Sequence, residues 1–250
     1  MPPIRFDILT TFPEMFADTP GCALNHSIPA RARAAGLVEW HATNIRDFAG
    51  GKHAKTDDRP FGGGPGMVMM CQPVYDAVLA VEARDQRPAT RILLTPQGRP
   101  LTQPLVEDLA AKPRLLLIAG HYEGLDERVI DTLAPLEVSI GDYVLSGGEL
   151  AAMVLMDAVI RLLPGALGHE DSASQDSFGK IEVGGQGTGK NKTEPTTARL
   201  LDCPHYTKPR EWMGMPVPDI LLSGDHGQIE KWRTQQRLQR TRDRRPDLLA

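Results

Sequence analysis

Two short apolar runs place the strongest constraint on the fold of this chain. Residues 91–95 read Arg-Ile-Leu-Leu-Thr and are closed by Pro96, and residues 115–119 read Leu-Leu-Leu-Ile-Ala and are closed by Gly120. Runs of this length without polar alternation are typical of strands that are covered on both faces, as in a parallel sheet. The sequence therefore predicts a parallel sheet.

Other segments complete the pattern around these two runs. Further strands are expected at residues 4–9 and 38–42, and helices at residues 73–84 and 104–111. Strands that alternate with helices are typical of an α/β domain. The predicted fold class is therefore α/β, built on a parallel sheet.

A longer helix is expected from about residue 149 to residue 163, where Pro164-Gly165 ends it. Apolar residues surround most of this helix, so we expect it to be buried. Asp157 and Arg161 are then exceptions, because a buried charge needs a partner or a task. The two residues are four positions apart and could simply pair with each other, so both interpretations stay open.

The composition changes in the C-terminal third of the chain. Ser, Gly, Asp, Lys and Thr dominate residues 168–197, which predicts a flexible linker. Beyond it, Ser223-Gly224-Asp225 is a typical cap for a helix, and seven basic residues lie between Lys231 and Arg245. The expected organisation is a domain of residues 1–166, a linker of residues 167–200 with an insertion at 179–198, and a small helical domain of residues 201–250.

Charge and cysteine content narrow the classes of protein. A net charge of −4 argues against nucleic-acid binding over the whole surface, although a basic end can still hold a phosphate backbone. No apolar run reaches the roughly 18 residues of a membrane span. Asp7 interrupts the stretch that a signal peptide would need, so a cytoplasmic protein is expected. Three scattered cysteines predict neither a disulfide framework nor a zinc cluster.

Three glycine-rich stretches compete as ligand sites. Residues 61–67 lack the spacing of a dinucleotide fingerprint and are interpreted as a rigid loop. Residues 184–191 nearly match a phosphate-binding loop, but Asn191 stands where Mg²⁺ needs Ser or Thr, so an inserted loop is the favoured interpretation. Residues 139–149 lie between a strand and the long helix, and their glycines allow main-chain groups to reach a flat ligand such as adenine. A tight turn without a ligand would look similar.

Several motifs in one order along the chain carry a more specific signal. They lie at residues 57–67, 95–99, 120–129, 139–149, 168–170, 176–178 and 201–207. Together they resemble the bacterial tRNA (guanine-N1-)-methyltransferases over nearly the whole chain. The resemblance implies S-adenosylmethionine as the methyl donor, a homodimer with shared sites, and an α/β domain whose C-terminal part is tied in a trefoil knot. It also implies dependence on Mg²⁺, for which we assign no ligands.

The resemblance assigns roles to individual positions. Those that would hold S-adenosylmethionine are Leu94, Thr95, Pro96, Gly120, Tyr122, Glu123, Ile140, Gly141, Asp142, Tyr143, Val144, Leu145, Gly147 and Gly148. Those that would contact the anticodon stem-loop of tRNA are Asp57, Arg59, Gly62, Asp202, Lys231, Arg233 and Arg237. The link between Asp176 and Asp202 is longer than is typical of this family, and the excess is the insertion at 179–198.

The implied reaction is methylation at N1 of guanosine 37, the nucleoside beside the anticodon. Guanine N1 carries a proton, and Asp176 matches the carboxylate base that the family uses to remove it. An ordinary aspartate has a pKa of about 3.9 and is a weak base for this proton; each pKa unit of mismatch costs about 1.4 kcal/mol. Arg161 matches the arginine that stabilises charge on guanine O6. Without the resemblance, Asp176 would be interpreted as a solvated turn residue.

Three other functions stay open on sequence alone. The chain could be a related knotted enzyme that methylates a ribose 2′-oxygen, a nucleotide-dependent switch that uses residues 184–192, or an RNA-binding protein without activity. His121, His169 and His205 are candidate acid–base groups, but the sequence shows no pairing for them and we assign them no role.

Overall fold

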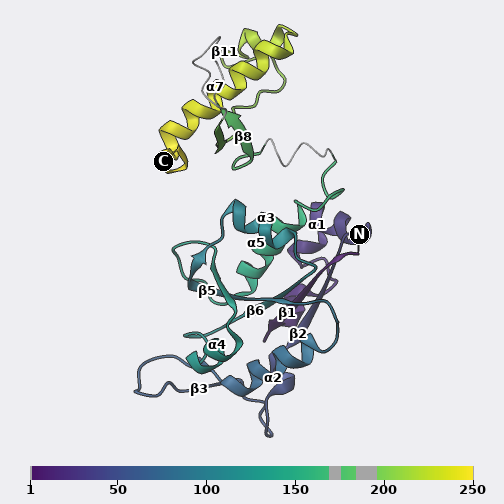
Figure 1. Ribbon diagram of the computed structural model, residues 1–250, viewed down its shortest axis with the longest axis vertical. Coiled ribbons are helices and arrows are strands. Elements are labelled where there is room, and N and C mark those ends of the chain that lie inside the picture. Colours follow the sequence, from purple (N-terminus) through teal and green to yellow (C-terminus); the bar gives the residue numbers. More distant parts are fainter. Residues whose placement is uncertain (1, 169–175, 184–195, 250) are drawn as a thin grey trace. The chain divides into compact units, whose positions relative to one another are not determined.

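The computed structural model describes residues 2–168, 176–183 and 196–249 (Figure 1). The chain divides into two compact units, Met1–Gly168 and His169–Ala250. No helix among the described residues is both long enough and apolar enough to cross a membrane. The glycine-rich residues 184–191 and the motif positions 169 and 170 lie outside the described residues.

A five-stranded sheet forms the centre of the N-terminal unit. Its order is β2-β1-β6-β5-β7, and every pairing between neighbours is parallel, which confirms the predicted sheet. Its strands are β1 (Ile4–Thr10), β2 (Val38–Asn44), β5 (Thr90–Pro100), β6 (Arg114–Ala119) and β7 (Leu136–Ser139). The first four were expected at defined residues, and β7 is the strand that the sequence placed, without bounds, before residues 139–149.

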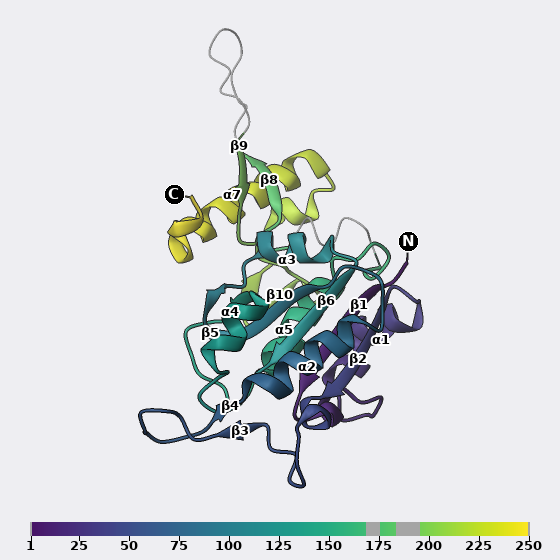
Figure 2. The same cartoon turned by 60° about the horizontal axis from the view of Figure 1, so that its bottom comes forward.

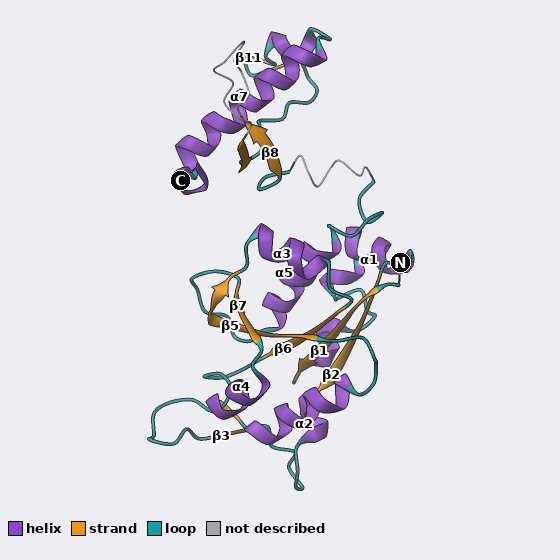
Figure 3. Cartoon of the chain, in the orientation of Figure 1, coloured by secondary structure: helices purple, strands orange, loops and turns teal. Residues whose placement is uncertain are grey.

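Helices cover both faces of this sheet and enclose two separate cores. They are α1 (Ser27–Ala34), α2 (Cys71–Glu82), α3 (Gln103–Ala110), α4 (Glu127–Leu133) and α5 (Glu149–Ile160). One core contains residues of α1, α3 and α5, and the other contains residues of α2 and α4. Figures 1, 2 and 3 show α1, α3 and α5 on one side of the sheet and α2 and α4 on the other. In β6, Leu115 and Leu117 face the first core while Leu116 and Ile118 face the second. This double burial explains why the strand has no polar alternation.

Helix α5 is buried on one face only, so the expectation that it is surrounded by the core was wrong. Leu150 is 53% exposed and Val154 is 48% exposed. These residues lie on one stripe with the exposed Asp157 and with Arg161, because the spacing of four, three and four positions returns to the same side of a helix. The helix also ends at Ile160, three residues earlier than expected, and Arg161 is its C-cap.

A buried arginine connects the sheet to the end of α2. Arg114 begins β6 and is almost fully buried, and its Nε lies 2.7 Å from a carboxylate oxygen of Asp7 on β1. Its two terminal nitrogens donate to the main-chain oxygens of Val81, at 2.6 Å, and Asp85, at 2.8 Å. The guanidinium therefore adds hydrogen bonds to carbonyls at and just beyond the end of α2, and it complements the helix dipole.

The backbone approaches itself closely at two glycines of the N-terminal unit. A Cβ atom on Gly148 would lie 2.8 Å from Cα of Ala119 and 3.0 Å from the nitrogen of Gly120. The amide of Gly148 donates to the carbonyl oxygen of Gly120 at 2.8 Å. A Cβ atom on Gly98 would likewise collide with the main chain of Val138. Any side chain at these glycines would push the two backbones apart.

The C-terminal unit contains one long helix and two small antiparallel pairs of strands. The helix is α7 (His226–Arg244), and the pairs are β8 (Lys180–Val183) with β9 (Thr196–Arg199), and β10 (Glu211–Trp212) with β11 (Met215–Pro216). Asp225 accepts a hydrogen bond from the amide of Gln228 at 3.0 Å, which confirms the predicted cap of α7. Strands β8 and β9 lie within the segment that the sequence assigned to the linker.

Short elements complete the description. A small antiparallel pair in the N-terminal unit is formed by β3 (Asp57–Asp58) and β4 (Val68–Met69). The short 3-10 helices are η1 (Pro13–Phe16), η2 (Ala23–Asn25), η3 (Ile45–Phe48), η4 (Asp219–Leu222) and η5 (Pro246–Leu249).

Removal of the buried arginine should destabilise the protein strongly. We expect Arg114→Leu to lower the free energy of unfolding by about 3 kcal/mol, because Asp7 and the carbonyls of α2 would lose a buried partner. Urea denaturation checks this value. The matched control is Arg128→Leu, because Arg128 pairs with Asp126 at 2.7 Å on the surface and should contribute little. Equal losses in the two variants would contradict the role given to Arg114.

A methyl group at Gly148 should be costly for the same unit. We expect Gly148→Ala to lower the free energy of unfolding by about 1–3 kcal/mol, the range for overpacking a site that cannot relax. Gly50→Ala is the control, because a Cβ atom at Gly50 meets nothing within 4 Å. Thermal unfolding measures both variants, and a Gly148→Ala protein as stable as Gly50→Ala would refute the close backbone contact.

Candidate active site

A cavity of about 410 Å³ opens at the carboxyl ends of β5, β6 and β7. Its wall comes from residues 93–97, 120–125, 138–141 and 143–148, with further residues from α4 and the start of α5. Open α/β sheets bind ligands at this edge, and the volume lies in the range of small-molecule sites. The cavity is therefore the candidate active site of the N-terminal unit.

The cavity gathers the positions that were assigned to the cofactor. All of them line it except Asp142, whose side chain is exposed. The lining members are Leu94, Thr95, Pro96, Gly120, Tyr122, Glu123, Ile140, Gly141, Tyr143, Val144, Leu145, Gly147 and Gly148. Segments that are far apart in the sequence thus form one surface, as a ligand site requires.

The wall combines apolar side chains with accessible main chain. Leu94, Ile140 and Leu145 supply apolar surface, and Gly120 and Gly141 bring backbone to the cavity without a side chain. Gly141 has a φ of +153°, and a Cβ atom there would collide with the ring of Tyr143. Such a wall suits a flat, partly apolar ligand whose edge can hydrogen-bond to main-chain groups.

The sequence analysis missed a hydrogen-bonded group beside the cavity. Nε2 of His121 lies 2.7 and 2.8 Å from the carboxylate oxygens of the buried Glu149. The hydroxyl of Thr10 donates to the same carboxylate at 2.5 Å. These bonds join the ends of β1 and β6 to the start of α5 and so fix the loops of the cavity. The sequence signal was a carboxylate at the first position of a helix whose other residues, Asp157 apart, are apolar.

Arg161 does not line the cavity of its own chain. The cavity touches the start of α5 at Gly148 and Ala151, whereas Arg161 follows its last turn. Ten residues of helix separate Ala151 from Arg161, which is about 15 Å at 1.5 Å per residue. Within one chain, the arginine assigned to guanine O6 is therefore remote from the positions assigned to the cofactor.

Asp176 belongs to the C-terminal unit, where it begins a turn. Its carbonyl oxygen accepts a hydrogen bond from the amide of Gly179 at 3.0 Å. The residue is partly exposed, and Phe178 in the same turn has a φ of +69°. The structure therefore places the candidate base in a defined turn directly before β8.

Strand β3 and the loop between β3 and β4 carry three of the positions assigned to tRNA. Asp57 is partly exposed, and Arg59 and Gly62 are exposed. The base of the loop is attached to the cavity wall, because the amide of Glu123 donates to the oxygen of Met67 at 3.0 Å. The end of the loop at Met67 therefore lies against the wall of the candidate ligand site.

Helix α7 differs from the expectation at one of its three assigned cations. Lys231 is exposed and Arg233 is partly exposed, as phosphate contacts would need. Arg237 is only 5% exposed, and its guanidinium lies 3.1 Å from Glu230 and 3.5 Å from Asp202. Arg237 is thus paired with two carboxylates, so in this structure it stabilises the packing of the C-terminal unit.

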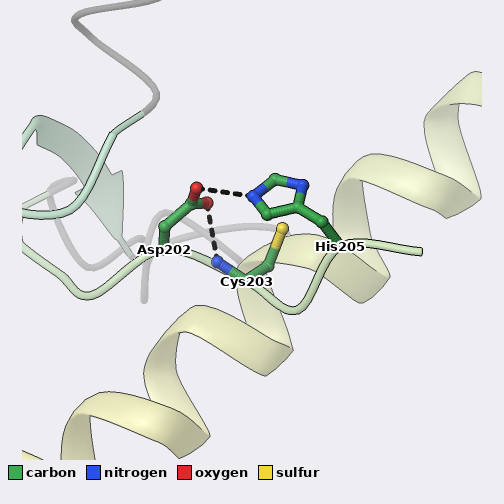
Figure 4. Close-up of side chains that lie close together, drawn as sticks. All are labelled: Asp202, Cys203 and His205. Carbon is green, nitrogen blue, oxygen red and sulfur yellow. Dashed lines mark hydrogen bonds and ion pairs between the residues drawn. The ribbon is translucent and has the colours of Figure 1, made fainter. Parts of the chain in front are cut away.

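Asp202, Cys203 and His205 form a compact cluster whose possible ligand atoms lie within 4.8 Å of one another (Figure 4). Asp202 is 2.7 Å from Nε2 of His205 and accepts the Cys203 amide at 2.6 Å. Burial raises the pKa of the Cys203 thiol, whereas a metal ligand must be a thiolate. Arg237 adds a positive charge at Asp202. The geometry therefore favours a hydrogen-bonded cluster over a metal centre.

The carboxylate in this cluster stays ionised. Burial by itself would raise the pKa of Asp202, but hydrogen bonds from His205 and the Cys203 amide, with the charge of Arg237, hold the pKa below its usual value. His205, which the sequence left without a partner, is therefore paired with Asp202.

Comparison with known proteins agrees with the family resemblance that the sequence motifs indicated. The family described as tRNA (Guanine-1)-methyltransferase TrmD matches residues 4–250. A tRNA (guanine-N(1)-)-methyltransferase of Chloroflexus aurantiacus is 51% identical over 99% of this chain and 88% of its own length. Proteins of the same name from Ruminiclostridium cellulolyticum and Neisseria meningitidis are 50% and 48% identical, over 98% and 96% of this chain and 96% and 88% of their own lengths. The chain therefore belongs to the tRNA (guanine-1)-methyltransferase TrmD family.

Proposed function

We propose that this protein transfers a methyl group from S-adenosylmethionine to N1 of guanosine 37 in tRNA, beside the anticodon. One observation carries the proposal: loops from three strand ends, with the motifs of this family, form one cavity of ligand size. The apolar wall and the exposed main chain at Gly120 and Gly141 fit the adenosyl part of the donor.

The chemistry divides between a base and a cation. Asp176 would accept the N1 proton of guanine, and the nitrogen would bond to the methyl carbon of S-adenosylmethionine. The carbon–sulfur bond of the sulfonium would break with its electron pair staying on sulfur, so that S-adenosylhomocysteine leaves as a neutral thioether. The loss of this proton develops negative charge on O6, which Arg161 stabilises. Because an ordinary aspartate is a weak base for this proton, the arginine is needed to close the pKa gap.

A homodimer with shared sites is part of the proposal. Arg161 follows the last turn of α5, remote from the cavity of its own chain, and Leu150 and Val154 leave an apolar stripe on the same side of that helix. Packing this stripe against a second copy would bury apolar area. Arg161 of one subunit would then serve the cavity of the other.

The proposal includes a Mg²⁺ ion. Glu123 and Glu127 line the cavity and offer the carboxylate oxygens that Mg²⁺ prefers, so the residues present fit an ion that would supply positive charge there.

The remaining parts of the proposal concern RNA contacts, the knot and location. Asp57, Arg59 and Gly62 would contact the anticodon stem-loop, and Lys231 and Arg233 would contact its phosphates. A trefoil knot is supported by the close backbone approach at Gly148 and Gly98. A cytoplasmic location follows from the tRNA substrate.

Loss of the carboxylate at position 176 should abolish catalysis selectively. We expect Asp176→Ala to form no detectable N1-methylguanosine while the Kd for S-adenosylmethionine stays within about twofold, since the cavity lies in the other unit. Mass spectrometry of nucleosides from treated tRNA and calorimetric titration of the donor provide the two measurements. Asp108→Ala, an exposed acid on α3, is the control and should retain full turnover. Normal turnover by Asp176→Ala would sink the assignment.

Mixed dimers test the shared site. Arg161→Ala and the cavity-filling Gly141→Val should each be inactive alone. Unfolding and refolding an equal mixture should restore about a quarter of the wild-type active sites, because half of the dimers are mixed and each holds one intact site. Either variant refolded by itself is the control. Mixed dimers that form but show no activity would contradict sharing, and a monomer in solution would contradict the dimer itself.

A further inference from the structure

We propose that Ser177 and Thr241 are positioning residues that fix the turn carrying Asp176 to helix α7, so that placement of the base is coupled to the helix that holds tRNA. The connection runs through residues 199–202, here called the connecting segment. This inference rests on the proposed function, because it assigns a task to groups that surround the proposed base.

The turn of Asp176 is attached to the connecting segment by three hydrogen bonds. The amide of Phe178 donates to the oxygen of Leu200 at 2.8 Å. The amide of Asp202 donates to the hydroxyl oxygen of Ser177 at 3.0 Å, and a terminal nitrogen of Arg199 donates to the oxygen of Phe178 at 2.7 Å. The residue next to the base thus has its side chain engaged by the connecting segment.

The connecting segment is attached in turn to the C-terminal part of α7. The amide of Leu201 donates to the hydroxyl oxygen of Thr241 at 2.9 Å, and this hydroxyl donates to the oxygen of Arg237 at 2.7 Å. Thr241 is completely buried. Arg240 donates to the oxygen of Asp202 at 3.2 Å, and Arg237 pairs with its carboxylate at 3.5 Å. Neighbouring turns of the helix therefore hold the segment.

These bonds are strong enough to transmit position. Breaking a buried hydrogen bond so that one partner stays unsatisfied costs about 1–3 kcal/mol, so the amide of Leu201 keeps its place opposite Thr241. A helix is stiff along its length, and Lys231 and Arg233 on the same helix are available to phosphates. When tRNA fixes α7, it also fixes the turn that carries Asp176.

The same network explains why Arg237 and Asp202 are not available as simple RNA contacts. Asp202 has its carboxylate shared among His205, the Cys203 amide and Arg237, and its main chain bonded to Ser177 and Arg240. Arg237 in turn is held by Glu230. These two residues act inside the C-terminal unit, where they hold the connecting segment against α7.

The test uses full-length protein and separates binding from the chemical step. Ser177→Ala and Thr241→Val each remove one hydroxyl of the connection. We expect the single-turnover rate constant at saturating tRNA and donor to fall by about tenfold or more, because the base is less often in place. The Kd for tRNA and the Kd for S-adenosylmethionine should stay within about twofold, since no contact with either ligand is removed. Ser177→Thr and Thr241→Ser retain the hydroxyls and should recover most of the rate.

Matched controls exclude a general effect of lost hydroxyls. Thr132→Val removes a hydroxyl that makes the same bond to the carbonyl four residues earlier, at 2.6 Å on the exposed face of α4, and should leave the rate unchanged. A rate loss explained wholly by weaker tRNA binding, or an unchanged rate in Ser177→Ala, would overturn the proposal. If Thr241→Val does not fold, Ser177→Ala alone decides. Failure of the proposed function would look different, because wild-type protein would then form no N1-methylguanosine.

Discussion

The direct contact of backbone at Gly148 with the end of β6 is the constraint on which the cavity depends. The amide of Gly148 donates to the carbonyl oxygen of Gly120, and there is no room for a side chain between these two backbone segments. Strand β6 is held from both sides by the two cores, so this wall of the cavity cannot retreat. Glu149 follows directly and takes the bonds of Thr10 and His121. The position of the cavity is therefore a consequence of how the sheet is packed.

Sequence patterns predicted the parts of the fold whose signal is local. The apolar runs of β5 and β6 were recognised because double burial removes polar alternation within a few residues. Strand β7 was expected only as a strand of unstated bounds before residues 139–149, because four residues with Glu137 among them carry little local signal and pair only with β5. The exposed stripe of α5 was missed for a related reason. Its apolar Leu150 and Val154 look like core residues, and only the packed structure shows that no element of the described chain covers them.

The candidate site divides in the same way. Glycine turns at strand ends could be predicted, because glycine lacks a side chain and so allows its backbone to come close to another backbone or to a ligand. The group of Thr10, His121 and Glu149 could not be predicted, since 139 positions separate its first and last members. Arg237 was assigned to tRNA because it lies in a run of basic residues, but the structure shows that it is buried. A sequence shows how many basic residues a helix has, but not which of them are buried. The neighbours Glu230 and Asp202 make Arg237 a structural cation, and Asp202 comes from outside the helix.

In the proposed mechanism, a single folded copy of the N-terminal unit holds the cavity but does not bring the proposed cation, Arg161, beside it. Arg161 is separated from that cavity by the length of α5, and Asp176 belongs to the other unit. If Asp176 is the base, as proposed, this distribution has a physical advantage, because a base that meets its substrate only after assembly cannot act on the wrong nucleobase or on water. The proposed coupling of Asp176 to α7 adds a second advantage. Binding energy gained along the RNA backbone would then help to place the carboxylate, instead of only raising the affinity.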